Sequence, residues 1–215
     1  MNLLDIRNLS IELDTPSGRV LAVDRVSLSI KEGEVRGLVG ESGSGKSLLA
    51  QAIIGVLEDK WHVHADRFHW RGIDLLRLSI DERKALLCRD IAMIFQEPMS
   101  CLDPTTLIGE QLSEAIDTTQ LSGHFWQRKK QRKEAVIKLL HKVGIKKHEQ
   151  CINSYPHQLT EAICQRVMIA IALAGRPILL IADEPTAAME STTQGQIFRL
   201  LANLNQLKNM SILLI

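Results

Sequence analysis

The spacing of apolar residues changes along the chain, and each change predicts a different kind of element. Short runs with strand character occupy residues 9–13, 26–30 and 35–39. From about residue 97 to 158 the apolar positions recur at helical spacing, and residues 178–181 return to a continuous apolar run. The pattern predicts an α/β protein in which early and late strands form one core and helices are inserted between them.

Four segments carry further expectations. Residues 178–181 are consecutive large aliphatics, as in a strand buried on both faces in the middle of a parallel sheet. Residues 210–215 are similar but stop at an apolar residue, so we expect an unpaired strand end that promotes aggregation. Residues 61–70 alternate and predict a two-faced strand or a hairpin, whose three histidines we expect to face solvent rather than bind a metal. Residues 193–207 predict a helix with one core-facing side.

The segment 40–47 has glycines, a lysine and a hydroxyl in the pattern G-x-x-x-x-G-K-S, which forms a cradle for phosphate. Gly43 and Gly45 let the backbone turn tightly and point its N–H groups inward. Lys46 then reaches the β- and γ-phosphates, and Ser47 opens a helix, expected over 46–57, with its hydroxyl placed for Mg²⁺. The expected nucleotide-binding residues are Gly40, Glu41, Ser42, Gly43, Ser44, Gly45, Lys46, Ser47 and Leu48.

Two carboxylates follow the strand at 178–181. Asp183 and Glu184 are expected at its carboxyl end, the edge where open α/β sheets place their ligands. Asp183 would hold Mg²⁺, and Glu184 would polarise the water that attacks the γ-phosphate. The alternative is an acidic strand end that caps a helix.

The order of these motifs resembles the ATP-binding subunit of an ABC transporter, and in particular the oligopeptide/dipeptide importer branch. Residues 91–98 look like the strand into the Q-loop, where Gln96 would touch Mg²⁺ and sense the γ-phosphate. Residues 99–111 resemble the importer branch through Leu102-Asp103-Pro104 and Gly109-Glu110-Gln111. Residues 159–166 stand at the signature position and residues 187–190 at the D-loop position.

The resemblance implies a P-loop NTPase (RecA-like) ABC cassette with an N-terminal antiparallel β region and an inserted helical lobe. The expected domains are residues 1–96 as the first part of the nucleotide-binding core, 97–175 as the helical lobe with the signature motif, and 176–215 as the second part of the core. The switch histidine of the family is absent, so the chain looks truncated, and we expect weak or no hydrolysis by this form alone.

The signature departs from the family pattern Leu-Ser-Gly-Gly-x-x-Gln. Here Thr160 keeps the hydroxyl, but Glu161 and Ala162 replace both glycines, and Gln165 closes the motif. In the family these four positions face ATP held by the other subunit of a dimer. At about 5 Å and an effective dielectric near 20, a carboxylate and a phosphate charge repel by roughly 3 kcal/mol. We therefore expect the composite site completed by Thr160 to be weak or non-hydrolytic.

The adenine site also departs from the family. An aromatic residue usually stacks on the base near residues 17–20, but no Phe, Tyr or Trp precedes Trp61. Since base stacking contributes about 1–3 kcal/mol in nucleic-acid systems, nucleotide binding is expected to be weaker or less selective. A stack of the Arg19 guanidinium on the base could compensate.

Composition agrees with a one-domain α/β protein, since the 215 residues are 45% hydrophobic with a net charge of +1. No apolar run is long enough to span a bilayer. Four widely spaced cysteines favour reduced thiols. The basic run 128–133 suggests nucleic acid or anionic lipid, but apolar residues follow it on one face, so we favour a solvated helix start and expect no nucleic-acid partner.

Two functions remain open. In the first, the chain binds and hydrolyses ATP with Mg²⁺ and energises a transporter of peptides, including antimicrobial peptides, or of a polyamine. In the second, it is a nucleotide-binding regulatory subunit with little turnover. The resemblance implies a second ATPase subunit in a heterodimer, two membrane permease subunits and, indirectly, a periplasmic binding protein. It also implies a peripheral place on the cytoplasmic face of the bacterial inner membrane.

Overall fold

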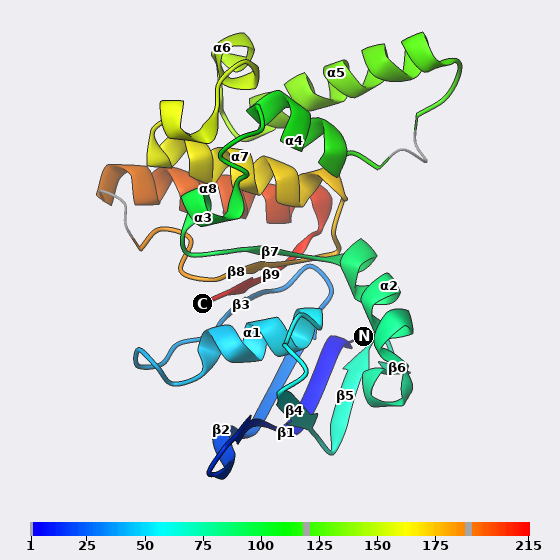
Figure 1. The fold of residues 1–215 in the computed structure, drawn as a ribbon, viewed down its shortest axis with the longest axis vertical. Helices are drawn as coiled ribbons and strands as arrows, with labels where there is room; N and C mark the ends of the chain where they lie inside the picture. Colours follow the sequence, from blue (N-terminus) through cyan, green and yellow to red (C-terminus); the bar gives the residue numbers. More distant parts are fainter. Residues whose placement is uncertain (1, 118–120, 188–190) are drawn as a thin grey trace. The chain divides into compact units, whose positions relative to one another are not determined.

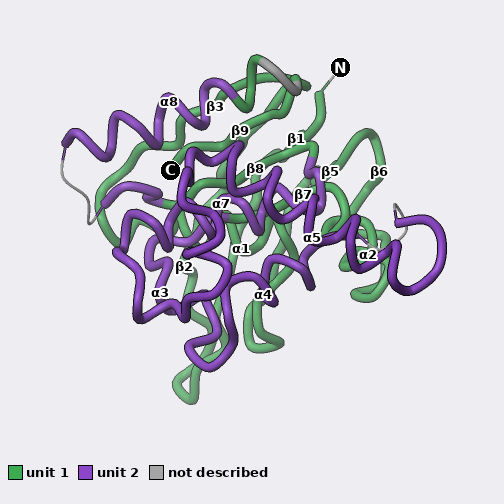
Figure 2. The backbone as a smooth tube through the Cα atoms, turned by 90° about the horizontal axis from the view of Figure 1, so that it is seen from above, with its two compact units in different colours: residues 1–93, 178–183, 204–215 green, residues 94–177, 184–203 purple. Residues whose placement is uncertain are grey.

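The fold was analysed in a computed structural model that describes residues 2–117, 121–187 and 191–215. The chain, whose elements are labelled in Figure 1, forms two compact units, which Figure 2 shows in different colours. Unit 1 comprises residues 1–93, 178–183 and 204–215, and unit 2 comprises residues 94–177 and 184–203. Residues 184–203 thus fall in unit 2, whereas the sequence analysis assigns them to the core. The domain boundaries at 96/97 and 175/176 stay a prediction.

An antiparallel five-stranded sheet forms the first part of unit 1. Its long strands β1 (Asn2–Thr15) and β2 (Gly18–Lys31) pair with each other. On its other edge β1 pairs with β4 (Trp61–His64) and then with β5 (Arg67–Trp70), which continues to β6 (Ile73–Asp74). Residues 61–70 are therefore two short strands that bind successive parts of β1, and the alternative of a hairpin is wrong.

The second sheet of unit 1 has the order β3-β9-β8-β7. Parallel pairing joins β3 (Val35–Gly37) to β9 (Ser211–Leu214), and β9 to β8 (Leu179–Ala182). The strand β7 (Ile91–Ile94) lies at the far edge, and its first three residues belong to unit 1. Because β9 has a partner on each side, the expectation that residues 210–215 form an unpaired strand end is wrong.

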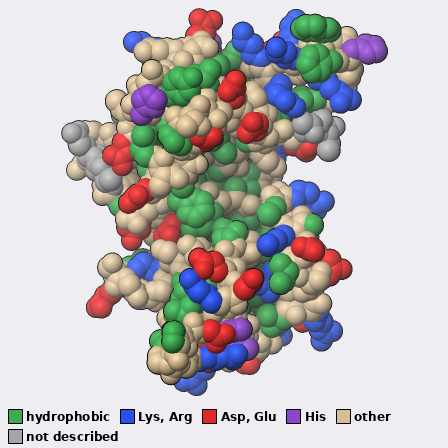
Figure 3. All heavy atoms as spheres, viewed as in Figure 1, with side chains coloured by type: hydrophobic (Ala, Val, Ile, Leu, Met, Phe, Trp, Pro, Cys, Tyr) green, Lys and Arg blue, Asp and Glu red, His purple; other side chains and the backbone are tan. Residues whose placement is uncertain are grey.

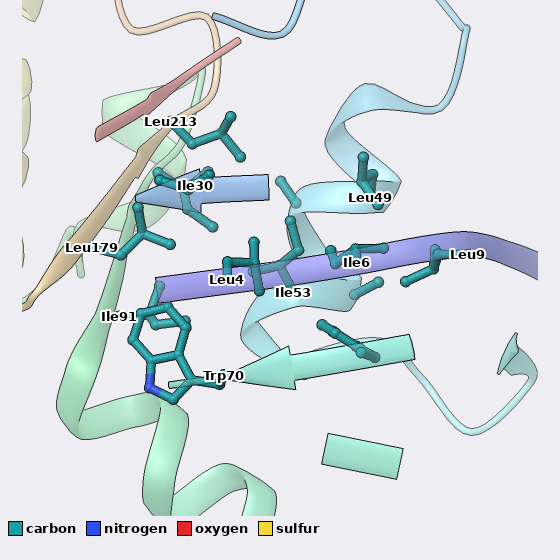
Figure 4. Close-up of a cluster of buried hydrophobic side chains, with 14 of the residues drawn as sticks. Leu4, Ile6, Leu9, Ile30, Leu49, Ile53, Trp70, Ile91, Leu179 and Leu213 are labelled. Atoms are coloured by element: carbon teal, nitrogen blue, oxygen red, sulfur yellow. The ribbon is translucent and has the colours of Figure 1, made fainter. Parts of the chain in front are cut away.

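The core of unit 1 draws apolar side chains from both sheets and from α1 (Lys46–Ile54), as Figure 4 shows. Alternate residues of β1 point into this cluster because successive side chains of a strand face opposite sides. The labelled members are Leu4, Ile6, Leu9, Ile30, Leu49, Ile53, Trp70, Ile91, Leu179 and Leu213, all of them buried. The cluster anchors α1, which follows the phosphate segment, and the partly buried Leu38 just before that segment packs against it.

Helix ends in unit 1 follow local backbone signals. Helix α1 ends at Ile54, not at residue 57, because Gly55 takes the left-handed conformation (φ 75°) and its N–H donates back to the Gln51 and Ala52 carbonyls. Helix α2 (Ile80–Asp90) begins with a capping box between Ser79 and Glu82. The short 3-10 turn η1 (Leu75–Arg77) leads into it.

Unit 2 is helical and is organised around α7 (Glu161–Ala174), against which α3, α4 and α5 pack. Most residues of α7 after Ile163 are buried, as expected for a helix surrounded by others. The surrounding elements are α3 (Pro98–Cys101), α4 (Ile108–Ala115), α5 (Phe125–Lys142), α6 (His148–Ile152), η3 (Pro156–Gln158) and the first part of α8 (Ser191–Lys208). The predicted helix over 193–207 is confirmed by α8.

Candidate nucleotide site

The phosphate segment leaves β3 and turns into α1 within unit 1. Gly43 and Gly45 have φ values of 78° and 88°, in the region that L-residues with a side chain rarely adopt. At Gly45 a Cβ atom would come within 2.8 Å of Val23 Cγ2 and 3.3 Å of the Ala22 carbonyl oxygen. Two independent features therefore favour glycine at position 45: the positive φ angle and the close approach of β2.

The N-terminal turn of α1 offers donors to an anion. Gly45 is its N-cap, no side chain caps it, and its first turn contains no acidic residue. The first N–H groups of a helix lack intrahelical acceptors, and here they belong to Lys46, Ser47 and Leu48. The helix dipole adds positive potential at the same place. This part of unit 1 is therefore suited to phosphate oxygens.

Lys46 folds back across the segment. Its ammonium Nζ donates to the carbonyl oxygens of Gly40 (3.0 Å) and Glu41 (2.7 Å). A Cβ on Gly40 would come within 2.9 Å of Ser44 Oγ, so Gly40 gives the loop the room that it needs to close. The remaining predicted contact residues, Ser42 and Ser47, are exposed.

Asp183 directly follows β8. In its sheet, β8 is separated from β3 only by β9. Asp183 is 6% exposed, and its Oδ1 atom is buried with no hydrogen-bond partner among the described residues. A buried carboxylate oxygen without a partner is costly unless a cation or donor binds it. Mg²⁺ prefers oxygen ligands of this kind, so Asp183 and the Ser47 hydroxyl fit the expected metal.

Unit 2 holds the two predicted catalytic residues, Gln96 and Glu184. Gln96 Nε2 donates to Glu184 Oε2 at 3.0 Å, although the two residues are 88 positions apart. Glu184 has a φ of 43°, which is unusual for a residue with a side chain. The structure thus joins Gln96 to Glu184 directly, a link that the sequence analysis did not contain.

The altered signature begins α7. Thr160 is the N-cap, but its side chain caps no backbone group, and Glu161 is the acidic residue of the first turn. Thr160 and Glu161 are exposed and Ala162 is half-buried. The hydroxyl and the carboxylate of the motif are thus open to solvent in unit 2.

Gln165 lies elsewhere than the sequence analysis expects. It is fully buried, and its Nε2 donates to the Pro185 carbonyl oxygen at 2.9 Å, one residue after Glu184. A side chain that is enclosed in unit 2 cannot also reach ATP on another subunit. The sequence carried a signal for this, because the residues of α7 that follow it are almost all apolar.

Arg19 is held by acidic neighbours at the start of β2. Its guanidinium pairs with Asp14 (3.0 Å) and with Glu12 (3.7 Å), and Asp14 also accepts a hydrogen bond from His62. The His62 hydrogen bond is the main cause that lowers the pKa of Asp14. To stack on a base, the Arg19 guanidinium must therefore either keep these two ion pairs or break them.

The remaining expectations concern the D-loop, metal ligands and membrane spans. The D-loop residues Ala188, Met189 and Glu190 lie outside the described part of the chain. In the described part, no three His, Cys, Asp or Glu side chains gather as metal ligands, and no helix is both long and apolar enough to cross a bilayer.

A family model described as ABC transporter matches residues 23–187, which include the phosphate segment, Gln96, the signature and Glu184. The chain belongs to the ABC transporter family. The resemblance noted from the motifs is thereby confirmed.

Two dimeric structures of the cassette MJ0796 share the fold of this ABC cassette over 98% of its length. One, in a post-hydrolysis state with ADP and Pi, has a TM-score of 0.79 and 28% identity and is covered over 86% of its chain. The other has a TM-score of 0.78 and 27% identity and is covered over 87%.

The relatives of similar sequence are named as ATP-binding proteins of peptide or dipeptide transport. The peptide transport system ATP-binding protein SapD of Salmonella typhimurium is 60% identical over all 215 residues, which span 65% of that relative. SapD of Haemophilus influenzae is 51% identical over 214 residues, 61% of its length. The dipeptide transport ATP-binding protein DppD of Escherichia coli is 46% identical, with 64% of its length covered. The peptide and dipeptide transport names of these relatives agree with the expected branch of the family, and the chain spans 61–65% of their lengths.

Proposed function

We propose that this ABC cassette binds and hydrolyses ATP and so energises a peptide transporter. The observation that carries the proposal is the phosphate segment of unit 1 with its uncapped helix N-terminus, together with the buried Asp183 Oδ1 just beyond β8, which has no hydrogen-bond partner in the described part of the chain. The names of SapD and DppD support the peptide cargo. Cationic antimicrobial peptides and polyamines remain within the proposed range of cargo.

The roles follow from the chemistry of each residue. When bound, ATP supplies the phosphoryl group and Mg²⁺ the charge that offsets its oxygens. The backbone of residues 40–48 and the Lys46 ammonium hold the phosphates, and Ser47 and Asp183 hold the metal. Glu184 polarises the attacking water as a base or an orienting group. Gln96, already hydrogen-bonded to Glu184, fixes the direction of that carboxylate and adds a ligand for the metal.

The proposed partners come from the relatives' role in transport systems. They are a second ATPase subunit, forming a heterodimer, two membrane permease subunits and, indirectly, a periplasmic binding protein. The cassette would then sit peripherally on the cytoplasmic face of the inner membrane. A heterodimer agrees with the altered signature, because an intact partner signature could complete the hydrolytic site.

The test compares Mg-ATP binding and hydrolysis by the chain and by two variants, each alone and with the partner cassette. Lys46→Ala should abolish binding, because it removes the charge that faces the phosphates. Glu184→Gln should bind Mg-ATP but lose turnover in the assembled pair, because its size is kept and its basicity is lost. If Lys46→Ala binds Mg-ATP as the unchanged chain does, the phosphate segment is not the nucleotide site and the proposal fails.

A regulatory subunit with little turnover is the second candidate, and Glu161 is the observation that favours it. Its carboxylate is exposed in the first turn of α7, where the family presents glycine to a partner's phosphate. The double variant Glu161→Gly/Ala162→Gly should raise turnover of the assembled pair if the altered signature limits hydrolysis. Turnover that stays absent in this variant, with binding intact, would favour the regulatory role.

A further inference from the structure

The first half of α5 concentrates positive charge that forms no ion pair within the described part of the chain. Five of the six residues at 128–133 are Lys or Arg. Among the described residues no acidic side chain forms an ion pair with them. The first turn of α5 contains no acidic residue either. Cations near a helix N-terminus oppose the helix dipole and repel one another, so the helix gains nothing from this placement.

Two large aromatic side chains stand beside these cations. Phe125 is 72% exposed and Trp126 is 76% exposed, and each is more exposed than any other aromatic residue of the chain. Their rings touch edge to face, with centroids 5.7 Å apart and planes at 79°. Single exposed apolar residues are common on protein surfaces, but an exposed pair at the end of a basic run is not explained by packing.

A groove of about 890 Å³ runs along this part of α5, within unit 2. Its walls include the aromatic pair, the cations, and Gly109 and Ile152 from the neighbouring helices α4 and α6. Arg132 lines it, and the Nε atom of Arg132 is buried without a hydrogen-bond partner among the described residues. Figure 3 shows blue side chains gathered beside large green ones over the N-terminal end of α5, at the upper right of the view.

We propose that residues 125–133, the α5 basic surface, dock on an anionic lipid bilayer. Phe125 and Trp126 enter the interface between headgroups and acyl chains, and the five cations lie against lipid phosphates. Stable binding to a bilayer requires two signals, and an apolar insertion beside a polybasic segment supplies both. This proposal is independent of the nucleotide chemistry proposed above.

A bilayer fits the surface better than a nucleic acid does. Binding of single strands needs aromatic faces that are open for bases to stack on. Among the described residues that line this groove, only Phe125 and Trp126 are aromatic, and they are adjacent in sequence, so they form no row of faces for successive bases. Aromatic side chains next to Lys and Arg are the composition that anchors proteins at the membrane interface.

The experiment measures partitioning of the full chain, without nucleotide, onto phosphatidylcholine vesicles with and without phosphatidylglycerol. We expect binding only to the anionic vesicles, weakened by salt. Each cation near an anionic surface changes the partition coefficient about fivefold, so Lys129→Gln/Lys130→Gln should weaken binding about 30-fold. The matched control is Lys146→Gln/Lys147→Gln, an exposed pair of the same unit with the same loss of charge. It should weaken binding less than about threefold.

Insertion of the aromatic pair has its own readout. Tryptophan emission should shift to the blue on anionic vesicles, and the shift should vanish in Trp126→Phe. The variant Lys46→Ala should bind vesicles unchanged, which separates this proposal from that for the nucleotide site. Equal binding to uncharged vesicles, or equal loss in the two double variants, would overturn the proposal. Preference for a single-stranded oligonucleotide or an acidic protein over anionic vesicles, lost in Lys129→Gln/Lys130→Gln, would also overturn it.

Discussion

Replacing Gly45 by alanine adds a methyl group where unit 1 leaves no room. The backbone there has a φ of 88°, and the new Cβ would lie 2.8 Å from Val23 Cγ2 and 3.3 Å from the Ala22 carbonyl oxygen. The left-handed conformation costs an alanine about 1–2 kcal/mol. Overpacking against β2 adds about 1–3 kcal/mol. The free energy of unfolding of unit 1 should therefore fall by about 2–5 kcal/mol in Gly45→Ala.

Gly72 provides the matched control. It has a φ of 82°, but nothing lies within 4 Å of the position that its Cβ would take, in the turn between β5 and β6. Gly72→Ala therefore carries the backbone cost alone, about 1–2 kcal/mol. The difference between the two variants isolates the clash with β2, and it should be about 1–3 kcal/mol.

Urea unfolding followed by tryptophan emission measures this difference. In a Trp126→Phe background the remaining tryptophans, Trp61 and Trp70, both belong to unit 1. Gly45→Ala should also weaken Mg-ATP binding, because a shift of the loop misaligns the N–H groups, whereas Gly72→Ala should not. If both variants lose the same stability, the close approach of β2 to Gly45 does not constrain the fold, and the reasoning is refuted.

Three further predictions test other contacts. Gln165→Met leaves the Pro185 carbonyl without its donor, so urea unfolding should show a loss of about 1–3 kcal/mol; unchanged stability would speak against the buried contact. The pKa of Asp14 is lowered, mainly by its hydrogen bond to His62, from the ordinary value of 3.8. Its stabilising effect is therefore present above about pH 4 and is lost as the pH falls through the folded-state pKa, so the difference in urea midpoint between the unchanged chain and Asp14→Asn should shrink below about pH 4; a constant difference would contradict this. Burial raises the pKa of the Cys151 thiol to about 11, whereas Cys88 is exposed. A thiol reagent at about pH 8 should label Cys88 in the folded chain and Cys151 only after unfolding, as mass spectrometry would detect; equal labelling would contradict the burial.

Some expectations failed because they depended on which segments become neighbours. The apolar run at 210–215 was expected to end unpaired, yet β9 lies between β3 and β8. Gln165 was expected to face a partner's ATP, yet it is enclosed in unit 2 beside Pro185. For residues 210–215 the local pattern gave the strand correctly, while in both cases the neighbours come from other parts of the chain.

The sequence by itself determined the elements whose conformation is encoded locally. Glycines at 43 and 45 permit positive φ values, and the residues that follow form a helix with free N–H groups, so the phosphate segment could be read from eight positions. Only the tertiary structure decided that Gln96 donates to Glu184 and that a buried oxygen of the Asp183 carboxylate finds no hydrogen-bond partner among the described residues. The physical reason is that backbone preferences act over a few residues, whereas hydrogen-bond partners and burial depend on how strands and helices far apart in sequence pack together.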